Sequence, residues 1–223
     1  MAGGRRSGRA VFWDWATVFA PKGPSWGKCL YLAMGPWAAR LEVTAAQLDK
    51  RLPKAPKGLS GAAWWEERIA ACEELLRELG LPEPWVELCA RRVRTVALCP
   101  ALWTVGGKDA VPALALACYQ GCENYLIGDA LPEALGLLLR LHLGQFFAGG
   151  LVSGQAGEES NTPGFLRRAW EAAGRPASCW LAGGAPAQRE EAKSLGWRTA
   201  KKTGDKGSAD LAVERWAQLA QYL

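Results

Sequence analysis

The spacing of hydrophobic and polar positions changes along the chain at about residue 104. Between residues 28 and 103, apolar side chains recur every three or four residues, with charged side chains between them. This spacing is typical of helices that bury one face. It predicts helices over residues 38–52, 64–79 and 85–98, with Gly80 and Pro82 ending the second of them.

The remainder of the chain alternates short apolar runs with helical segments. The runs predict strands over residues 10–13, 124–127, 150–153, 179–182 and 197–200. The segments after them predict helices over residues 111–121, 132–143, 162–174, 186–195 and 210–222. Alternation at roughly 25-residue spacing favours a parallel sheet with helices on both faces. We therefore expect an α/β fold in which the helical part is inserted directly after the first strand.

Composition narrows the class of protein. The chain has 223 residues, of which 49% are hydrophobic and 22% charged, values typical of a soluble globular protein. No apolar run reaches the ~18 residues that a membrane span needs, so we expect no membrane partner. The net charge of +5 comes without a dense basic run, and we therefore expect no nucleic-acid partner.

The cysteines and the histidine predict no metal site. The seven cysteines are scattered without a CxxC pair, and His142 is the single histidine. Zinc sites need clustered ligands of these two types. An odd number of unpaired cysteines also favours a reducing compartment, so we expect a cytoplasmic protein.

Tryptophan is the unusual feature of the composition, with 12 residues against 5 Phe and 4 Tyr. Trp13 and Trp15 flank Asp14, and Trp180 lies in the predicted strand that leads to Gly183 and Gly184. We predict that these indoles fill the space around the ends of the strands and make it apolar. In the pair Trp64 and Trp65, helical geometry predicts that only one indole faces the interior. The other is expected to lie on the flank of the helix, either covered by the sheet-containing domain or exposed as a partner surface.

Open parallel sheets place their binding sites at the carboxyl ends of the strands. Asp14 ends the first strand and is therefore a candidate site residue. The other candidates follow the ends of the predicted strands and are expected to line a ligand cleft: Trp15, Ala16, Thr17, Gly128, Asp129, Ser160, Gly183 and Gly184.

These strand ends resemble a known family. The segment AVFWDWATVF at residues 10–19 resembles the first motif of the haloacid dehalogenase (HAD) superfamily, a hydrophobic strand that runs into Asp-x-Asp-Gly-Thr. The later motifs of the family are resembled by residues 125–129, 150–166, 180–186 and 192–199. The resemblance covers nearly the whole chain. It implies a Rossmann-like core domain over residues 9–20 and 104–223 and a helical cap domain over residues 21–103.

The family's catalytic positions mostly hold other residues here. Asp14 matches the nucleophile. The positions of the general acid, the hydroxyl, the lysine and the metal-binding aspartate hold, in that order, Ala16, Ile127, Ser160 (or Glu159 in the neighbouring register) and Gly184. Because Gly184 has no carboxylate, we expect no magnesium cofactor.

Two functions remain. The first is a non-catalytic protein that binds a protein partner or a small ligand in the cleft between core and cap. The alternative is an active hydrolase of the phosphatase or phosphonatase type that uses Asp14 as nucleophile. Asp14-Trp15-Ala16 resembles the motif of phosphonoacetaldehyde hydrolases, which use a cap lysine as a Schiff base, and the expected cap holds the lysines Lys50, Lys54 and Lys57.

Overall fold

The computed structural model describes residues 8–54, 58–106 and 109–223, so Lys57 lies outside the described residues. The described residues form two compact units. The helical unit is Lys22–Thr104, and the sheet unit consists of the described residues before and after it. In the helical unit, Lys50 and Lys54 are exposed. None of the described helices is both long and apolar enough to cross a membrane.

A sheet of parallel strands organises the sheet unit, in the order β3-β2-β1-β4-β5-β6. The strands are β1 (Arg9–Asp14), β2 (Glu123–Gly128), β3 (Phe147–Val152), β4 (Ser178–Ala182), β5 (Arg198–Lys202) and β6 (Leu211–Val213). The first strand lies at the centre and pairs with both β2 and β4. Strands buried on both faces read as continuous apolar runs, which is why the sequence shows them clearly.

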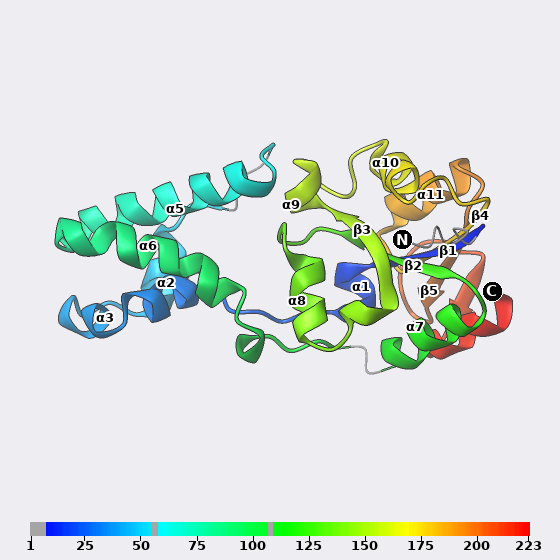
Figure 1. The fold of residues 1–223 in the computed structure, drawn as a ribbon, viewed down its shortest axis with the longest axis horizontal. Helices are drawn as coiled ribbons and strands as arrows, with labels where there is room; N and C mark the ends of the chain where they lie inside the picture. The colour runs from blue at the N-terminus through cyan, green and yellow to red at the C-terminus, as the bar shows by residue number, and fades with distance from the viewer. Residues whose placement is uncertain (1–7, 55–57, 107–108) are drawn as a thin grey trace, which may run out of the picture. The chain divides into compact units, whose positions relative to one another are not determined.

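Helices cover both faces of this sheet (Figure 1). Those of the sheet unit are α1 (Trp15–Phe19), α7 (Ala110–Tyr119), α8 (Ala134–Arg140), η2 (Gly144–Phe146), α9 (Ser153–Ala156), α10 (Phe165–Ala172), α11 (Pro186–Ser194) and η3 (Trp216–Tyr222). On the α10 and α11 side, Phe12 and Ile127 belong to a core that includes Phe165. On the other side, Trp13 packs edge-on against Trp216 with ring centroids 6.2 Å apart.

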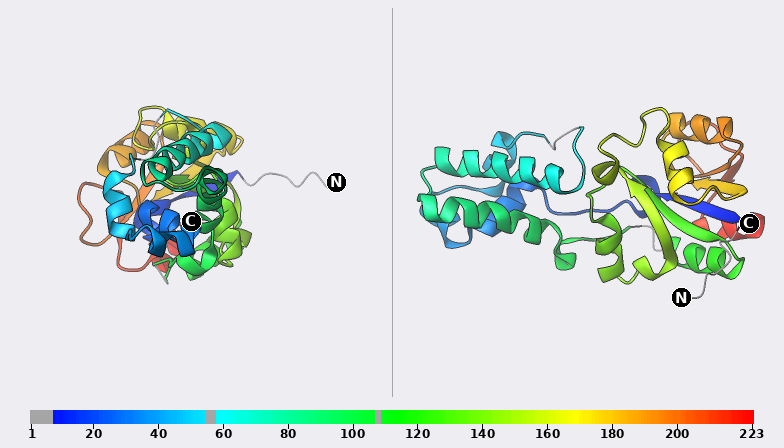
Figure 2. Two further views of the ribbon diagram at one scale, coloured as in Figure 1. Left: turned by 90° about the vertical axis from the view of Figure 1, so that its left-hand side faces the viewer. Right: turned by 45° about the horizontal axis from the view of Figure 1, so that its top comes forward.

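The helical unit contains α2 (Trp26–Met34), α3 (Pro36–Arg40), α4 (Ala45–Arg51), α5 (Gly61–Glu78), α6 (Glu83–Ala97) and η1 (Pro100–Leu102). The long helices α5 and α6 form a hairpin and run side by side (Figure 2). At the two ends of this unit, the backbones of Lys22 and Thr104 exchange hydrogen bonds of 2.8 and 2.9 Å. These bonds tie together the two points where the chain enters and leaves the unit.

Both indoles of the Trp64 and Trp65 pair are buried, so the second indole is covered and does not form an exposed patch. The two rings meet edge to face with centroids 4.9 Å apart. Trp26 of α2 packs against both, at 5.6 and 6.1 Å. An aromatic residue from a neighbouring helix therefore covers the flank that a single helix would leave exposed.

The predicted helix over residues 210–222 is wrong. Residues 211–213 form β6 beside β5, and a 3-10 helix, η3, follows from Trp216. The Asp109 carboxylate accepts a 2.8 Å hydrogen bond from the Trp216 backbone N–H and forms an ion pair with Lys202. Pairing with β5, together with a carboxylate that is distant in sequence, overrides the local helical pattern.

Two further elements differ from the prediction. Residues 15–19 form α1, a helix that the hydrophobic spacing does not predict, and Asp14 accepts hydrogen bonds at its start. The helix predicted from residue 162 begins at Phe165. It follows Gly164, whose φ of +91° is left-handed and whose backbone N–H donates to Glu191 at 2.8 Å.

Candidate functional site

Asp14 lies at the carboxyl end of the central strand and is 3% exposed. Its Oδ1 accepts hydrogen bonds from the Thr17 backbone N–H at 2.8 Å and from the Thr17 hydroxyl at 2.7 Å. This arrangement caps α1, so one carboxylate oxygen is already used by the fold. The other oxygen, Oδ2, faces Gly128 at the end of β2.

The Thr17 hydroxyl links two strand ends. It donates to Asp14 and accepts a 2.8 Å hydrogen bond from the backbone N–H of Gly184, after β4. The turn that carries this N–H has left-handed φ angles, +84° at Gly183 and +78° at Gly184. A Cβ atom at Gly183 would collide with the Thr17 hydroxyl. Glycine is therefore needed at position 183 for both backbone conformation and close approach.

A second chain of hydrogen bonds joins the end of β2 to the loop after β4. Asp129 is exposed, and its Oδ1 accepts a 2.7 Å hydrogen bond from the backbone N–H of Ser160. The Ser160 carbonyl accepts from Gln188 Nε2 at 3.1 Å. Gln188 Oε1 in turn accepts from the Ala185 backbone N–H at 2.7 Å. The buried Gln188 and Ser160 thus satisfy one another.

The mapping of the family's hydroxyl onto Ile127 is wrong in the structure. The Ile127 side chain is fully buried in the apolar core beneath α10. A Cβ atom at Gly128 would instead lie 2.8 Å from Asp14 Oδ2. Position 128, rather than position 127, directs a side chain toward the carboxylate, and in this chain it has none.

Burial raises the pKa of the Asp14 carboxyl, because the ionised form loses its hydration. The hydrogen bonds from Thr17 oppose this shift, and the negative charge of Asp129 adds to it. No described lysine or arginine donates to either carboxylate. The strand ends therefore combine two nearby acidic groups without a neutralising cation.

The candidate residues fall into two groups. The structure brings Asp14, Thr17, Gly128, Gly183 and Gly184 into contact, and it connects Asp129 with Ser160. Trp15 is buried beside Gly128, while Ala16 is exposed on α1.

The predicted filling by indoles is wrong for two of the three tryptophans. Trp13 donates its indole N–H to Asn124 at 2.7 Å on the face that η3 covers. Trp180 stacks with the Arg198 guanidinium of β5 at 5.6 Å. Hydroxyl, amide and backbone groups make the connections between the strand ends instead.

Arg189 was missed by the sequence reasoning. Its guanidinium is 1% exposed and donates to the carbonyls of Gly184, Lys206 and Ser208, the last at 2.9 Å. These bonds anchor the Gly184 turn to the loop before β6. The surrounding segment, PAQREEAKS, reads as a surface helix and gives no signal of this burial.

The sequence and the structure were compared with those of known proteins. No family model matches the sequence, and no curated protein matches it. Among solved structures, a 2-haloacid dehalogenase from Pseudomonas syringae pv. Tomato DC3000 is similar with a TM-score of 0.66 and 18% identity, over 96% of both chains. A HAD phosphatase from Thermococcus onnurineus is similar with a TM-score of 0.56 and 16% identity, over 96% of this chain and 97% of that one.

A defluorinating L-2-haloacid dehalogenase is similar over 96% of this chain and 94% of its own, with a TM-score of 0.58 and 19% identity. Sequence identities of 16%, 18% and 19% support a shared fold and nothing further. The parallel sheet flanked by helices belongs to that shared fold. The chain therefore has the fold of the HAD-like hydrolases.

Proposed function

We propose that this chain is a non-catalytic protein with a HAD-like fold that acts by binding a protein partner or a small ligand. The observation that carries the proposal is the Thr17 hydroxyl, which joins Asp14 to the Gly184 backbone N–H. In a phosphatase of this fold, the resemblance places a metal-binding carboxylate at position 184. Here the Gly184 backbone N–H donates to Thr17, and the Thr17 hydroxyl donates to Asp14. These groups have hydrogen-bond partners without any ligand.

The side chains present do not fit a magnesium ion of the phosphatase kind. Magnesium prefers octahedral coordination by oxygen, commonly from one or two carboxylates together with substrate phosphate and water. Asp14 Oδ1 and Asp129 Oδ1 already accept hydrogen bonds, and Gly184 offers no side-chain oxygen. The described residues contain no group of three or more metal-ligating side chains.

Charge supports the same proposal. A phosphate dianion beside Asp14 and Asp129 would meet two acidic groups, and the described residues supply no cation bonded to either. Raising the Asp14 pKa also lowers the fraction of nucleophilic carboxylate. A neutral or cationic group is therefore the more favourable occupant of these strand ends.

The alternative function is a hydrolase of the phosphatase or phosphonatase type with Asp14 as nucleophile. The observation that favours it is Asp14 Oδ2, which faces Gly128, where no side chain blocks it. A general acid two residues later is missing, because that position is Ala16. Losing one such positioned group costs roughly 10²–10⁴ in rate.

Two measurements on the full chain separate these functions. Calorimetric titration with Mg²⁺ and turnover of p-nitrophenyl phosphate are compared in the wild type, in Asp14→Asn and in Asp129→Asn. We expect no saturable Mg²⁺ binding and a rate that is the same in all three proteins. Saturable turnover that Asp14→Asn abolishes and Asp129→Asn retains would establish the hydrolase and end the non-catalytic proposal.

A further inference from the structure

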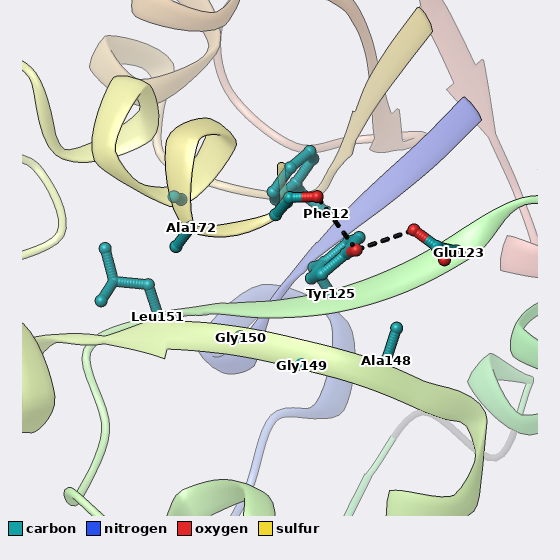
Figure 3. A pocket seen from close by; sticks show the side chains of 10 residues that line it. Phe12, Glu123, Tyr125, Ala148, Gly149, Gly150, Leu151 and Ala172 are labelled. Atoms are coloured by element: carbon teal, nitrogen blue, oxygen red, sulfur yellow. Dashed lines mark hydrogen bonds between the residues drawn. The ribbon is translucent and has the colours of Figure 1, made fainter. Parts of the chain in front are cut away.

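A cavity of about 290 Å³ lies on the sheet face beneath α10, away from Asp14 and Asp129. Its floor is formed by side chains of β1 and β2, its edge by β3 and its roof by α10 (Figure 3). The lining residues are Phe12, Glu123, Tyr125, Ala148, Gly149, Gly150, Leu151, Ala169, Ala172 and Ala173. The volume approaches the lower end of small-molecule sites, roughly 300 Å³.

The cavity exists because small residues meet where helices and sheets usually interlock large ones. Two alanines of α10, at positions 169 and 172, and Ala173 directly after it face two glycines of β3. A Cβ atom at Gly149 would lie 3.5 Å from the Tyr125 ring, which is ordinary contact, so a side chain there would enter the cavity. Protein interiors are normally packed without such voids.

The two ends of the cavity differ chemically. Leu151 and Ala172 lie at one end, and the Glu123 carboxylate lies at the other (Figure 3). The Tyr125 hydroxyl donates to Glu123 Oε2 at 2.8 Å, with the Ala173 carbonyl as a second acceptor at 3.3 Å. Among the described residues, Glu123 forms no ion pair, so its negative charge is available to a ligand.

The floor between these ends is aromatic. Tyr125 stacks on Phe12 with centroids 5.3 Å apart, and Phe12 stacks on Trp197 at 4.4 Å. Tyr125 is 8% exposed and is the ring that a ligand can reach, while the fully buried Phe12 supports it by stacking. A rigid aromatic surface favours a flat apolar group, and its face attracts a cation.

We propose that this cavity binds a small organic amine with an apolar body. The ammonium group donates to Glu123 beside the Tyr125 hydroxyl, and the apolar body lies along Gly149 toward Leu151. Hydrogen bonds between oppositely charged groups are roughly twice as strong as neutral ones, so charge fixes the orientation of the ligand. The aromatic floor and the alanines of α10 supply the apolar contacts.

Three matched probes test the proposal on the full chain: 2-phenylethylamine, the neutral 2-phenylethanol and the anionic 3-phenylpropionate. Affinities are measured by NMR titration of the backbone amides. We expect the amine to bind about tenfold more tightly than the alcohol and the anion more weakly still. Equal affinities for the three probes, or no saturable binding of the amine, would overturn the proposal.

Variants locate the binding site. Glu123→Gln should bring the amine to the affinity of the alcohol, and Gly149→Val should abolish binding by filling the cavity. Glu74→Gln, at an exposed carboxylate of α5 in the helical unit, is the matched control and should bind the amine like the wild type, since Glu74 does not line the cavity. Binding that is lost in Glu74→Gln, or kept in Gly149→Val, would contradict the assignment.

Circular dichroism checks that each variant is folded, and a direct contact test covers the case in which Gly149→Val is not. Intermolecular nuclear Overhauser effects in the wild type should connect the probe's ring with Leu151 and its methylene groups with Tyr125. Effects to other residues only would refute the site without any variant.

Discussion

The Thr17 hydroxyl determines how the Asp14 carboxylate is used. By donating to Asp14 and accepting from Gly184, it turns a residue at the nucleophile's place into a helix cap and a link between strands. The same pair of bonds makes the left-handed turn at Gly183 necessary. An aspartate at this position can therefore serve as a helix cap.

The pH dependence of stability should reveal the burial of Asp14. Its pKa in the folded state lies above the ordinary value of 3.8, so the folded state binds this proton more tightly than the unfolded state. The contribution of Asp14 to the free energy of unfolding therefore falls as pH rises from 3.8 through the folded pKa. Asp14→Asn removes this dependence and keeps an oxygen that can accept from Thr17.

Urea unfolding of both proteins over a series of pH values measures the effect. The stability of Asp14→Asn relative to the wild type should increase as pH rises through that window and then level off. A difference that stays constant, or that favours the wild type increasingly with pH, would show that Asp14 is not held in a desolvated environment.

At the same scale, the sequence predicted some site residues and missed others for physical reasons. Asp14 and the glycine pair were predicted because they follow strand ends, where open sheets place sites. The bonds of Gln188 and the burial of Arg189 were not predicted, since both depend on loops that lie far away in sequence. Ile127 was assigned one position too early, because only the pleat of β2 shows which side chain faces Asp14.

Among the elements, strand β3 shows that neighbouring glycines can have unlike roles. A Cβ atom at Gly150 would run into the carbonyl oxygen of Leu126 on β2. At Gly149 it would make ordinary contact with the Tyr125 ring. Gly150 permits close strand pairing, and Gly149 keeps the cavity open.

Alanine substitutions should separate these two roles. Gly150→Ala should lower the free energy of unfolding by roughly 1–3 kcal/mol, because the strands must shift to admit the methyl group. Gly149→Ala is the matched control and should raise it by about 0.5–1 kcal/mol, since alanine loses less chain entropy. Chemical denaturation measures both, and an equal effect of the two substitutions would contradict the geometry of β3.

Elements with their own periodicity were predicted, and short elements without it were not. The five longer strands and the long helices of the helical unit appear in the sequence because their apolar spacing is regular. The strand β6 is three residues long and pairs only at the sheet edge, beside β5. Nothing in its local pattern distinguishes it from the start of a helix.

At the scale of the whole molecule, each unit has a hydrophobic core of its own. In the helical unit, Leu76 of α5 is fully buried. In the sheet unit, Phe12 and Phe165 are fully buried within a separate cluster. Units with separate cores are expected to open as separate cooperative units.

Hydrogen exchange of the full chain tests this expectation. Leu76→Ala removes buried methyl groups and should cost about 2–5 kcal/mol of the stability of the helical unit. Backbone amides of α5 and α6 should lose protection, while those of β1 and β2 keep theirs. Equal loss of protection in both units would mean that the chain unfolds as a single cooperative body.

The central position of β1 has a consequence for synthesis of the chain. The first strand leaves the ribosome early, yet the Gly184 backbone N–H that Thr17 binds lies 167 positions later. At about 5–20 residues per second, roughly 10–30 s pass before the two can meet. Within that time the helical unit is completed while both neighbours of the apolar β1 are still missing, because β2 begins at Glu123 and β4 at Ser178. A nascent chain of this protein therefore carries an unpaired central strand that a chaperone could recognise.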